Sequence, residues 1–230
     1  MRSLVEKKGK EIFLFVTFLL VLYLSEWFWR LSEESVVIMI TVTLLGLLLS
    51  FDLLGFLKTK KKIIVYFILV IVGVNLVFTS FNSDLFKQNG TERSVFEQRK
   101  ELNHGINKLF INNGYNSYLK VQRNFFTNLD FNQYFFGGEP RFRNYAVDFS
   151  KFPFLFLPFF IYGIYIIAIE IKKYKIFLFS TLLVLVLATF TQTNSMMGIY
   201  TLFPIVISLI VLGLYSFFSF TYKKLRSESA

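Results

Sequence analysis

The sequence predicts an all-α integral membrane protein of about six transmembrane helices, with one extracytoplasmic loop subdomain between the third and the fourth helix. Composition is the first observation behind this fold class. Of the 230 residues, 54% are hydrophobic and 17% are charged, and the mean hydropathy is +0.54. A soluble domain carries about 25% charged residues. Six spans need about 120 apolar positions, which is close to the whole hydrophobic content. A single soluble globular domain is therefore excluded.

Six apolar runs are the second observation. Most are long enough to cross the hydrocarbon core of a bilayer, although the fifth is short. None alternates apolar and polar residues as a membrane-spanning strand does. All six are therefore predicted to be α-helices, which satisfy their own backbone hydrogen bonds in lipid. The predicted helices are Glu11–Leu31, Ser35–Leu57, Ile63–Phe81, Phe152–Ile171, Ile176–Phe190 and Ile199–Tyr222.

The distribution of cations is the third observation, and it sets the orientation. Fourteen lysines and arginines flank the predicted helices on one side of the membrane, whereas the two short loops on the other side hold only Arg30. Because cytoplasmic loops are enriched in Lys and Arg, both termini are predicted to be cytoplasmic. The chain is thus predicted to be a multi-pass protein of the plasma (inner) membrane. The fourteen cations are Arg2, Lys7, Lys8, Lys10, Lys58, Lys60, Lys61, Lys62, Lys172, Lys173, Lys175, Lys223, Lys224 and Arg226.

This topology divides the chain into three regions. Residues 1–81 form an N-terminal three-helix membrane region, and residues 152–230 form a C-terminal one with a short cytoplasmic tail. Between them, residues 82–151 form a polar, Asn-rich extracytoplasmic subdomain. Apolar residues at three- and four-residue spacing predict a short helix over Ser94–Leu109. The run Asn112–Gly114 is interpreted as the stop of that helix.

Two residue counts exclude several kinds of site. The chain has no Cys and one His, His104, so disulfides, thiolate metal sites, cysteine nucleophiles and histidine clusters are excluded. No metal site is predicted, and no cofactor is indicated. The formal charge of +10 comes mostly from lysines beside membrane helices, so nucleic acid is not predicted as a partner.

The first outer loop supplies the candidate catalytic residues, Glu26, Glu33 and Glu34. A membrane transferase that works at the outer face needs an acid there to act as a general base or to hold a metal ion. The alternative is a set of solvated charges beside an interfacial aromatic belt. The sequence Trp27-Phe28-Trp29 fits that alternative well.

A second candidate site precedes the fourth predicted helix. Two glycines and a proline predict a sharp turn around Glu139, Arg141 and Arg143. The two arginines can fork around a phosphate or a carboxylate, and the turn is close enough to the helix to reach lipid headgroups. These three residues are therefore the candidate binding site for a lipid phosphate. Ordinary contact between arginines and headgroups is the alternative.

Three polar residues inside or at the ends of predicted helices are interpreted as structural. Asp52 lies near the cytoplasmic end of the second helix, where it can pair with Lys58 or with water. Glu170 is expected to pair with the lysines that follow it. Asn75 lies deeper, in the third helix, and is expected to bond a neighbouring helix.

Six stretches in the second half of the chain carry a family resemblance: residues 109–119 (LFINNGYNSYL), 125–130 (FFTNLD), 134–143 (YFFGGEPRFR), 157–159 (LPF), 201–204 (TLFP) and 212–214 (LGL). Together they resemble bacterial polyprenyl-phosphate-sugar-dependent glycosyltransferases, which are membrane enzymes of the mannosyltransferase-like superfamily. In that family a Phe-Phe-x-Gly-Asp/Glu-Pro-x-x-Arg stretch precedes a helix that opens with aromatics and Leu-Pro-Phe. Its members have around ten or more helices, so the resemblance implies the C-terminal part of such an enzyme.

Two functional hypotheses remain open at the level of sequence. The first is a split or incomplete glycosyltransferase that acts at the outer face, with membrane lipid and a polyprenyl-phosphate-linked sugar as its ligands. The second is a non-catalytic membrane subunit whose loop binds a partner protein, such as another membrane subunit, or an envelope polymer. A transporter is the weakest reading, because no predicted helix carries a deep charge and no inverted repeat is visible.

Overall fold

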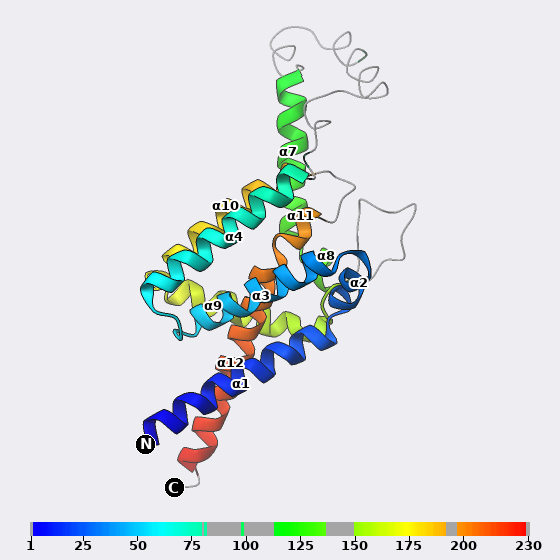
Figure 1. Ribbon diagram of the computed structural model, residues 1–230. Helices are drawn as coiled ribbons and strands as arrows, with labels where there is room; N and C mark the ends of the chain where they lie inside the picture. Colours follow the sequence, from blue (N-terminus) through cyan, green and yellow to red (C-terminus); the bar gives the residue numbers. More distant parts are fainter. Residues whose placement is uncertain are drawn as a thin grey trace.

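The computed structural model describes residues 2–79, 81, 98, 113–136, 150–191 and 197–228, which are helical apart from turns, bends and an isolated bridge between Phe81 and Thr191 (Figure 1). This confirms the all-α class. The helices are α1 (Arg2–Leu24), α2 (Glu26–Glu34), α3 (Val36–Leu53), α4 (Thr59–Thr79), α7 (Asn113–Leu129), α8 (Asn132–Phe135), the 3₁₀ turn η2 (Phe154–Phe156), α9 (Leu157–Ile169), α10 (Lys175–Ala188), α11 (Met197–Tyr200) and α12 (Phe203–Glu228).

Three of the described helices, α3, α4 and α12, are long and apolar enough to cross a membrane. A fourth span exists if α1 and α2 are counted together. The apolar helices Phe154–Ile169 and Lys175–Ala188 are shorter than this standard. At 1.5 Å per residue, the 14 residues of α10 measure about 21 Å, against a hydrocarbon core of about 30 Å. The described helices thus supply three to four candidate membrane spans by length and composition, against the six that the sequence predicts.

The first predicted helix is not one straight element. The chain bends by 69° between α1 and α2. Ser25 lies at the bend with extended backbone angles (φ −89°, ψ 121°), and its hydroxyl donates to the carbonyl oxygen of Val21 at 2.5 Å. The prediction of a continuous helix over Glu11–Leu31 was wrong at this point. A serine that bonds a carbonyl four residues back frequently bends a helix, and here the helix ends.

Further along the chain, two other features of the predicted helix boundaries can be compared with the structure. Asn113 begins α7, inside the run that is interpreted as the stop of the preceding predicted helix. That preceding helix is not described, so the interpretation stays a prediction. An Asn can serve at either end of a helix, and a local pattern does not say which. The last predicted helix is broken into α11 and α12 around Thr201 and Leu202, and only α12 is long enough to span. The predicted helix over Ser94–Leu109 lies outside the described residues.

Helix α12 is the centre of the bundle. In its apolar stretch Phe203–Tyr222, 67% is buried inside the protein, compared with 39% for the apolar stretch of α3 and 29% for that of α4. It packs against α9 at Gly163 and Gly213, where a Cβ atom on either residue would collide with a backbone carbonyl of the other helix. Glycines let two membrane helices approach this closely. The buried core therefore runs along α12, with α1, α3 and α9 around it.

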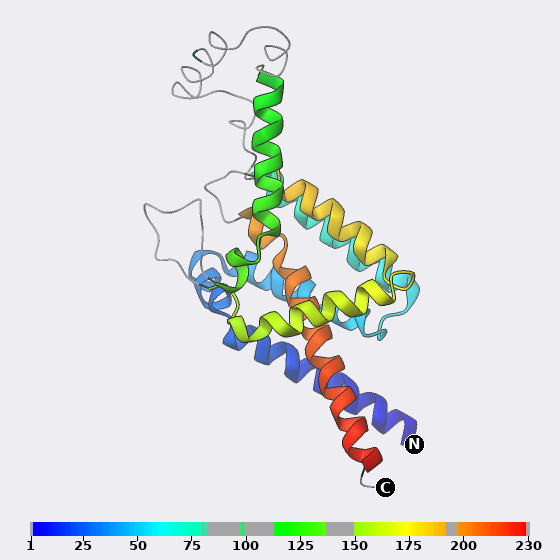
Figure 2. The same cartoon turned by 180° about the vertical axis from the view of Figure 1, so that it is seen from behind.

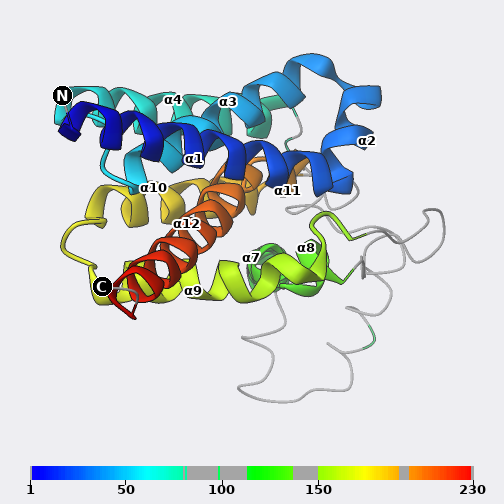
Figure 3. The same ribbon diagram turned by 90° about the horizontal axis from the view of Figure 1, so that it is seen from below.

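The helix ends that carry the fourteen flanking cations gather on one side. Seen from below, the N-terminus, the C-terminus, the α3–α4 turn and the α9–α10 turn lie on the left, and α2 lies on the right (Figure 3). Helices α4 and α10 run side by side in the same direction away from these turns (Figure 1). Helix α7 stands at the end of the molecule opposite both termini (Figure 2).

Candidate functional site

The predicted catalytic acids of the first outer loop do not converge. Glu26 forms an ion pair with Arg30 at 2.8 Å, and both side chains are more than 40% exposed. Glu33 lies two turns further along α2, about 10 Å away along the helix axis, and is exposed. The side chain of Glu34 lies outside the described residues. Within the part of the chain that the structure describes, no three His, Cys, Asp or Glu side chains are grouped to hold a metal ion.

The aromatic residues of the same loop divide between two environments. Trp29 is half exposed, as an interfacial belt residue should be, but Trp27 is 1% exposed and belongs to the core. Its ring centroid lies 4.9 Å from that of Phe203 and 6.1 Å from that of Phe152. The belt interpretation therefore fits Trp29 but not Trp27.

The predicted lipid-phosphate residues Glu139, Arg141 and Arg143 lie outside the described residues, but the chain on both sides of them is described. The Phe152 N–H donates to the carbonyl oxygen of Tyr134 at 2.8 Å. The backbone N–H of Trp27 donates to the carbonyl oxygen of Lys151 at 3.4 Å. These two bonds hold the chain before and after the arginine motif beside the bend between α1 and α2.

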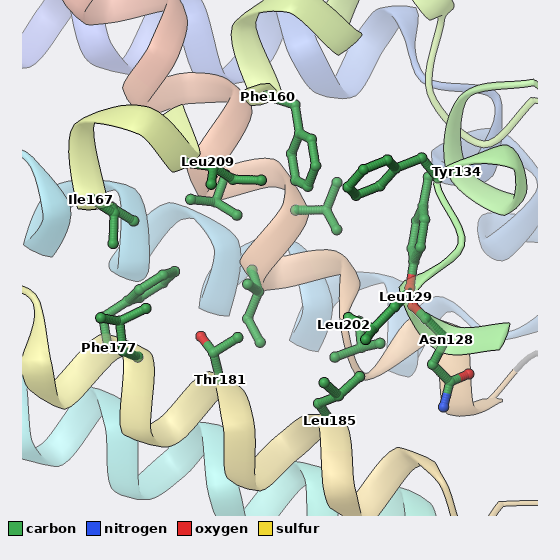
Figure 4. Close-up of a pocket in the computed structure, with 15 residues that line it drawn as sticks. Asn128, Leu129, Tyr134, Phe160, Ile167, Phe177, Thr181, Leu185, Leu202 and Leu209 are labelled. Atoms are coloured by element: carbon green, nitrogen blue, oxygen red, sulfur yellow. Dashed lines mark hydrogen bonds between the residues drawn. The ribbon is translucent and has the colours of Figure 1, made fainter. Parts of the chain in front are cut away.

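An apolar cavity of about 270 Å³ lies close to the same region, between α8, α9, α10, α12 and the end of α7 (Figure 4). The cavity is partly open to the surroundings of the bundle. A fully enclosed, engineered cavity of about 150 Å³ in another protein takes up benzene. The present cavity is nearly twice as large. Its walls are Asn128, Leu129, Phe131, Tyr134, Phe160, Ile164, Ile167, Phe177, Leu178, Thr181, Leu185, Leu202, Ile205, Val206 and Leu209.

The few polar groups of the cavity wall lie mainly at its α7–α8 end. The Tyr134 hydroxyl donates to the carbonyl oxygen of Asn128 at 2.8 Å, and the Asn124 amide of the same α7 face donates to the carbonyl oxygen of Thr189 at 3.1 Å. The side-chain amide of Asn128 is 2% exposed and meets no hydrogen-bond partner among the described residues. The hydroxyl of Thr181 on α10 is also buried and meets no hydrogen-bond partner among the described residues. The cavity wall is thus almost wholly apolar, and the side-chain amide of Asn128 at its α7–α8 end points away from the other lining side chains (Figure 4).

Sequence reasoning missed this cavity because its walls come from five separate elements. The one local signal was the pair Asn124 and Asn128, which are four residues apart and share a face of α7. A buried polar face on a loop helix indicates packing against something specific, but it does not say what.

A buried polar cluster lies at the other end of the bundle. Asp52, 5% exposed, accepts a hydrogen bond from the Tyr66 hydroxyl through Oδ2. Its Oδ1 forms an ion pair with Nζ of Lys62 at 2.8 Å. The expected pairing of Asp52 with a lysine is confirmed, but the lysine is Lys62 and not Lys58. Lys62 lies one turn into α4, and so it faces the end of α3. This cluster holds helices together.

The expected pair at Glu170 is also present. Lys173 Nζ lies 2.7 Å from Glu170 Oε2 on the exposed α9–α10 turn. Partial burial lowers the pKa of Lys173, but hydrogen bonds to Glu170 and Tyr174 outweigh this, so its pKa is raised above the ordinary value. The side chain stays protonated at neutral pH. The side chain of Asn75 has no described partner in the structure, and its expected bond to a neighbouring helix stays a prediction.

The chain was also compared with known proteins. No family model, no curated protein and no solved structure matches it.

Proposed function

We propose that this chain is a multi-pass membrane protein that binds a lipid-linked anion at the outer face of the plasma membrane. It is the membrane part of a glycosyltransferase that uses a polyprenyl-phosphate-linked sugar. The proposal places both termini in the cytoplasm and residues 82–151 outside. All six apolar segments cross the membrane, and the bilayer thins around the short helices α9 and α10.

The observation that carries this proposal is the position of the apolar cavity. Its α7–α8 end lies at Tyr134, a few residues before the motif of Glu139, Arg141 and Arg143. A hydrocarbon chain in the cavity would leave a lipid phosphate near the chain segment that carries the two arginines. The planar guanidinium forks of arginine suit a phosphate because they make paired, charge-assisted hydrogen bonds.

The chain's charge distribution supports the orientation. The four cationic helix ends lie together in Figure 3, on the opposite side from α2. Successive apolar segments run back and forth between these two sides, which is the pattern of a protein that crosses the bilayer repeatedly.

A non-catalytic membrane subunit is the second candidate, and one observation favours it. Glu26 is engaged with Arg30 by two hydrogen bonds, at 2.8 and 3.0 Å. Both hydrogen bonds end on the same oxygen, Oε1, so this candidate base is already engaged by a neighbouring side chain. Under this reading the loop binds a partner protein and the bound lipid is structural.

The first experiment removes the two guanidinium charges. The variant R141Q/R143Q should keep the fold and lose copurifying lipid-linked phosphate, as measured by mass spectrometry of the protein in mild detergent. Each charge-assisted bond is worth about 1.5–3 kcal/mol, so occupancy should fall tenfold or more. The control K120Q/R123Q removes two cations from α7 and should keep the lipid.

Unchanged lipid in R141Q/R143Q would place the phosphate site elsewhere. Lipid without a sugar, together with a stoichiometric protein partner, would favour the subunit over the enzyme.

The second experiment fills the cavity. Thr181→Trp places a large ring into the cavity from α10, whereas Leu182→Trp, at a neighbouring position that is 55% exposed, points away from it. The first variant should lose the copurifying lipid at equal helical content, and the second should keep it. Equal lipid in both would show that the cavity does not hold the chain of this lipid.

A further inference from the structure

We propose that the α3–α4 and α9–α10 turns together form a binding site for the headgroup of an anionic phospholipid of the cytoplasmic leaflet. This inference rests on the membrane embedding proposed above, but not on any sugar chemistry. It concerns the end of the bundle opposite α2. The residues that carry it are Lys58, Lys60, Lys61, Lys172 and Lys175, which we call the lysine patch.

The first step is that the two turns, 121 positions apart at their point of contact, form one surface. The Tyr174 hydroxyl donates to the carbonyl oxygen of Leu53 at 3.1 Å, and Tyr174 is 5% exposed. The ring centroids of Tyr66 and Phe177 lie 6.5 Å apart. Helices α4 and α10 then run side by side from these turns (Figure 1). The lysines of both turns are thereby held next to each other.

The second step is that the two carboxylates near these turns are already paired with other lysines. The two turns contain seven lysines, and the two carboxylates beside them are Asp52 and Glu170. Asp52 is paired with Lys62, and Glu170 is paired with Lys173. The five lysines of the patch are exposed and make no ion pair with any described residue. The surface therefore carries a net formal charge of +5.

The third step is that the backbone adds to this charge and does not offset it. Helices α4 and α10 both begin at the patch, and neither has an acidic residue in its first turn. The positive ends of two parallel helix dipoles therefore lie beside five ammonium groups, an arrangement that an anion stabilises.

The fourth step identifies the anion as a lipid. Directly after the lysines, both helices expose large apolar side chains. On α4 these are Ile63, Ile64 and Phe67, which are 56%, 57% and 66% exposed. On α10 they are Ile176 and Phe179, which are 46% and 70% exposed. A ligand with phosphate at the patch and hydrocarbon along these helices matches both surfaces, whereas a free phosphate matches the patch alone.

The test is native mass spectrometry of the full chain in detergent, with added phosphatidylglycerol or phosphatidylcholine of the same acyl chains. The wild-type protein should retain phosphatidylglycerol about tenfold better or more. The variant K60Q/K61Q/K172Q/K175Q should bring the two lipids to within about twofold of each other. The variant with arginine at the same four positions should fold and keep the preference.

A matched control removes the same number of positive charges from another part of the predicted cytoplasmic face, beside the two termini. The variant K7Q/K8Q/K223Q/K224Q should keep the preference for phosphatidylglycerol. The proposal is overturned if this control loses the preference equally, if the patch variant keeps it, if the arginine variant loses it, or if excess inorganic phosphate displaces the lipid. Preference retained in R141Q/R143Q would separate this site from the one proposed at the outer face.

Discussion

Asp52 is tolerated inside the bundle because two other side chains meet its two oxygens. Tyr66 donates to one, and the ammonium of Lys62 lies beside the other. Lys62 is 28% exposed, so it reaches water while it neutralises the carboxylate. The sequence allowed Asp52 to pair with Lys58 or with water, whereas the pairing with Lys62 depends on how α4 turns back against α3.

Removing the cation from this cluster should lower the free energy of unfolding more than removing the cation from an exposed ion pair. Lys62→Met leaves Asp52 buried without its cation, and should lower the free energy of unfolding by about 1–3 kcal/mol, the cost of leaving a buried polar group unsatisfied. The control Lys173→Met breaks a pair in which both side chains are about half exposed, and should change it by about 0.5 kcal/mol or less. Thermal unfolding in detergent, followed by circular dichroism, measures both. Equal losses in the two variants would contradict a structural role for the buried cluster.

At the scale of elements, the crossing of α9 and α12 is set by two glycines. Gly213 faces the backbone of Phe159, and Gly163 faces the backbone of Leu209. Backbone atoms cannot turn aside as a side chain can, so a methyl group at either position must push the helices apart. Since α12 is the most buried of the candidate spans, its contacts with α3 are expected to change as well.

Gly213→Ala should therefore destabilise the protein even though alanine is the better helix former. The expected loss is about 1–3 kcal/mol, from overpacking that outweighs the gain in helix propensity. Gly73→Ala is the control, because a Cβ there would lie 3.7 Å from Val184, an ordinary contact. That variant should be neutral or slightly more stable. Thermal midpoints of the two purified variants decide the matter, and a neutral Gly213→Ala would mean that α9 and α12 are not in close contact.

At the scale of the whole molecule, the flanking charges predict which side of the membrane each end occupies. The 14-to-1 distribution of flanking cations predicts a single orientation. Reporter fusions at Lys60 and at the C-terminus should report the cytoplasm, and a fusion at Lys120 should report the outside. A common location for Lys60 and Lys120 would rule out the proposed topology and, with it, an outer position for Arg141 and Arg143.

The sequence by itself determined the class of this protein, because the class depends on the total apolar content and on the length of the apolar runs. Apolar content, run length and the position of lysines can be counted without a structure, and they predicted an all-α chain with several membrane helices. They also located Glu170 in an ion pair, and they gave a lysine as one of two possible partners of Asp52, the other being water. The sites of the outer face stay predictions: the side chains of Glu139, Arg141 and Arg143 lie outside the described residues, and Glu26 is paired with Arg30.

Tertiary structure alone decided which faces of the helices meet. Helices such as α3, α9 and α10 are apolar on all sides, since both lipid and protein core favour apolar side chains, so periodicity does not reveal the buried face. Packing there depends on shape, as at Gly163 and Gly213, and shape is a property of two helices together. The apolar cavity and the joined lysine patch arise in the same way, because each needs segments that only the fold brings side by side.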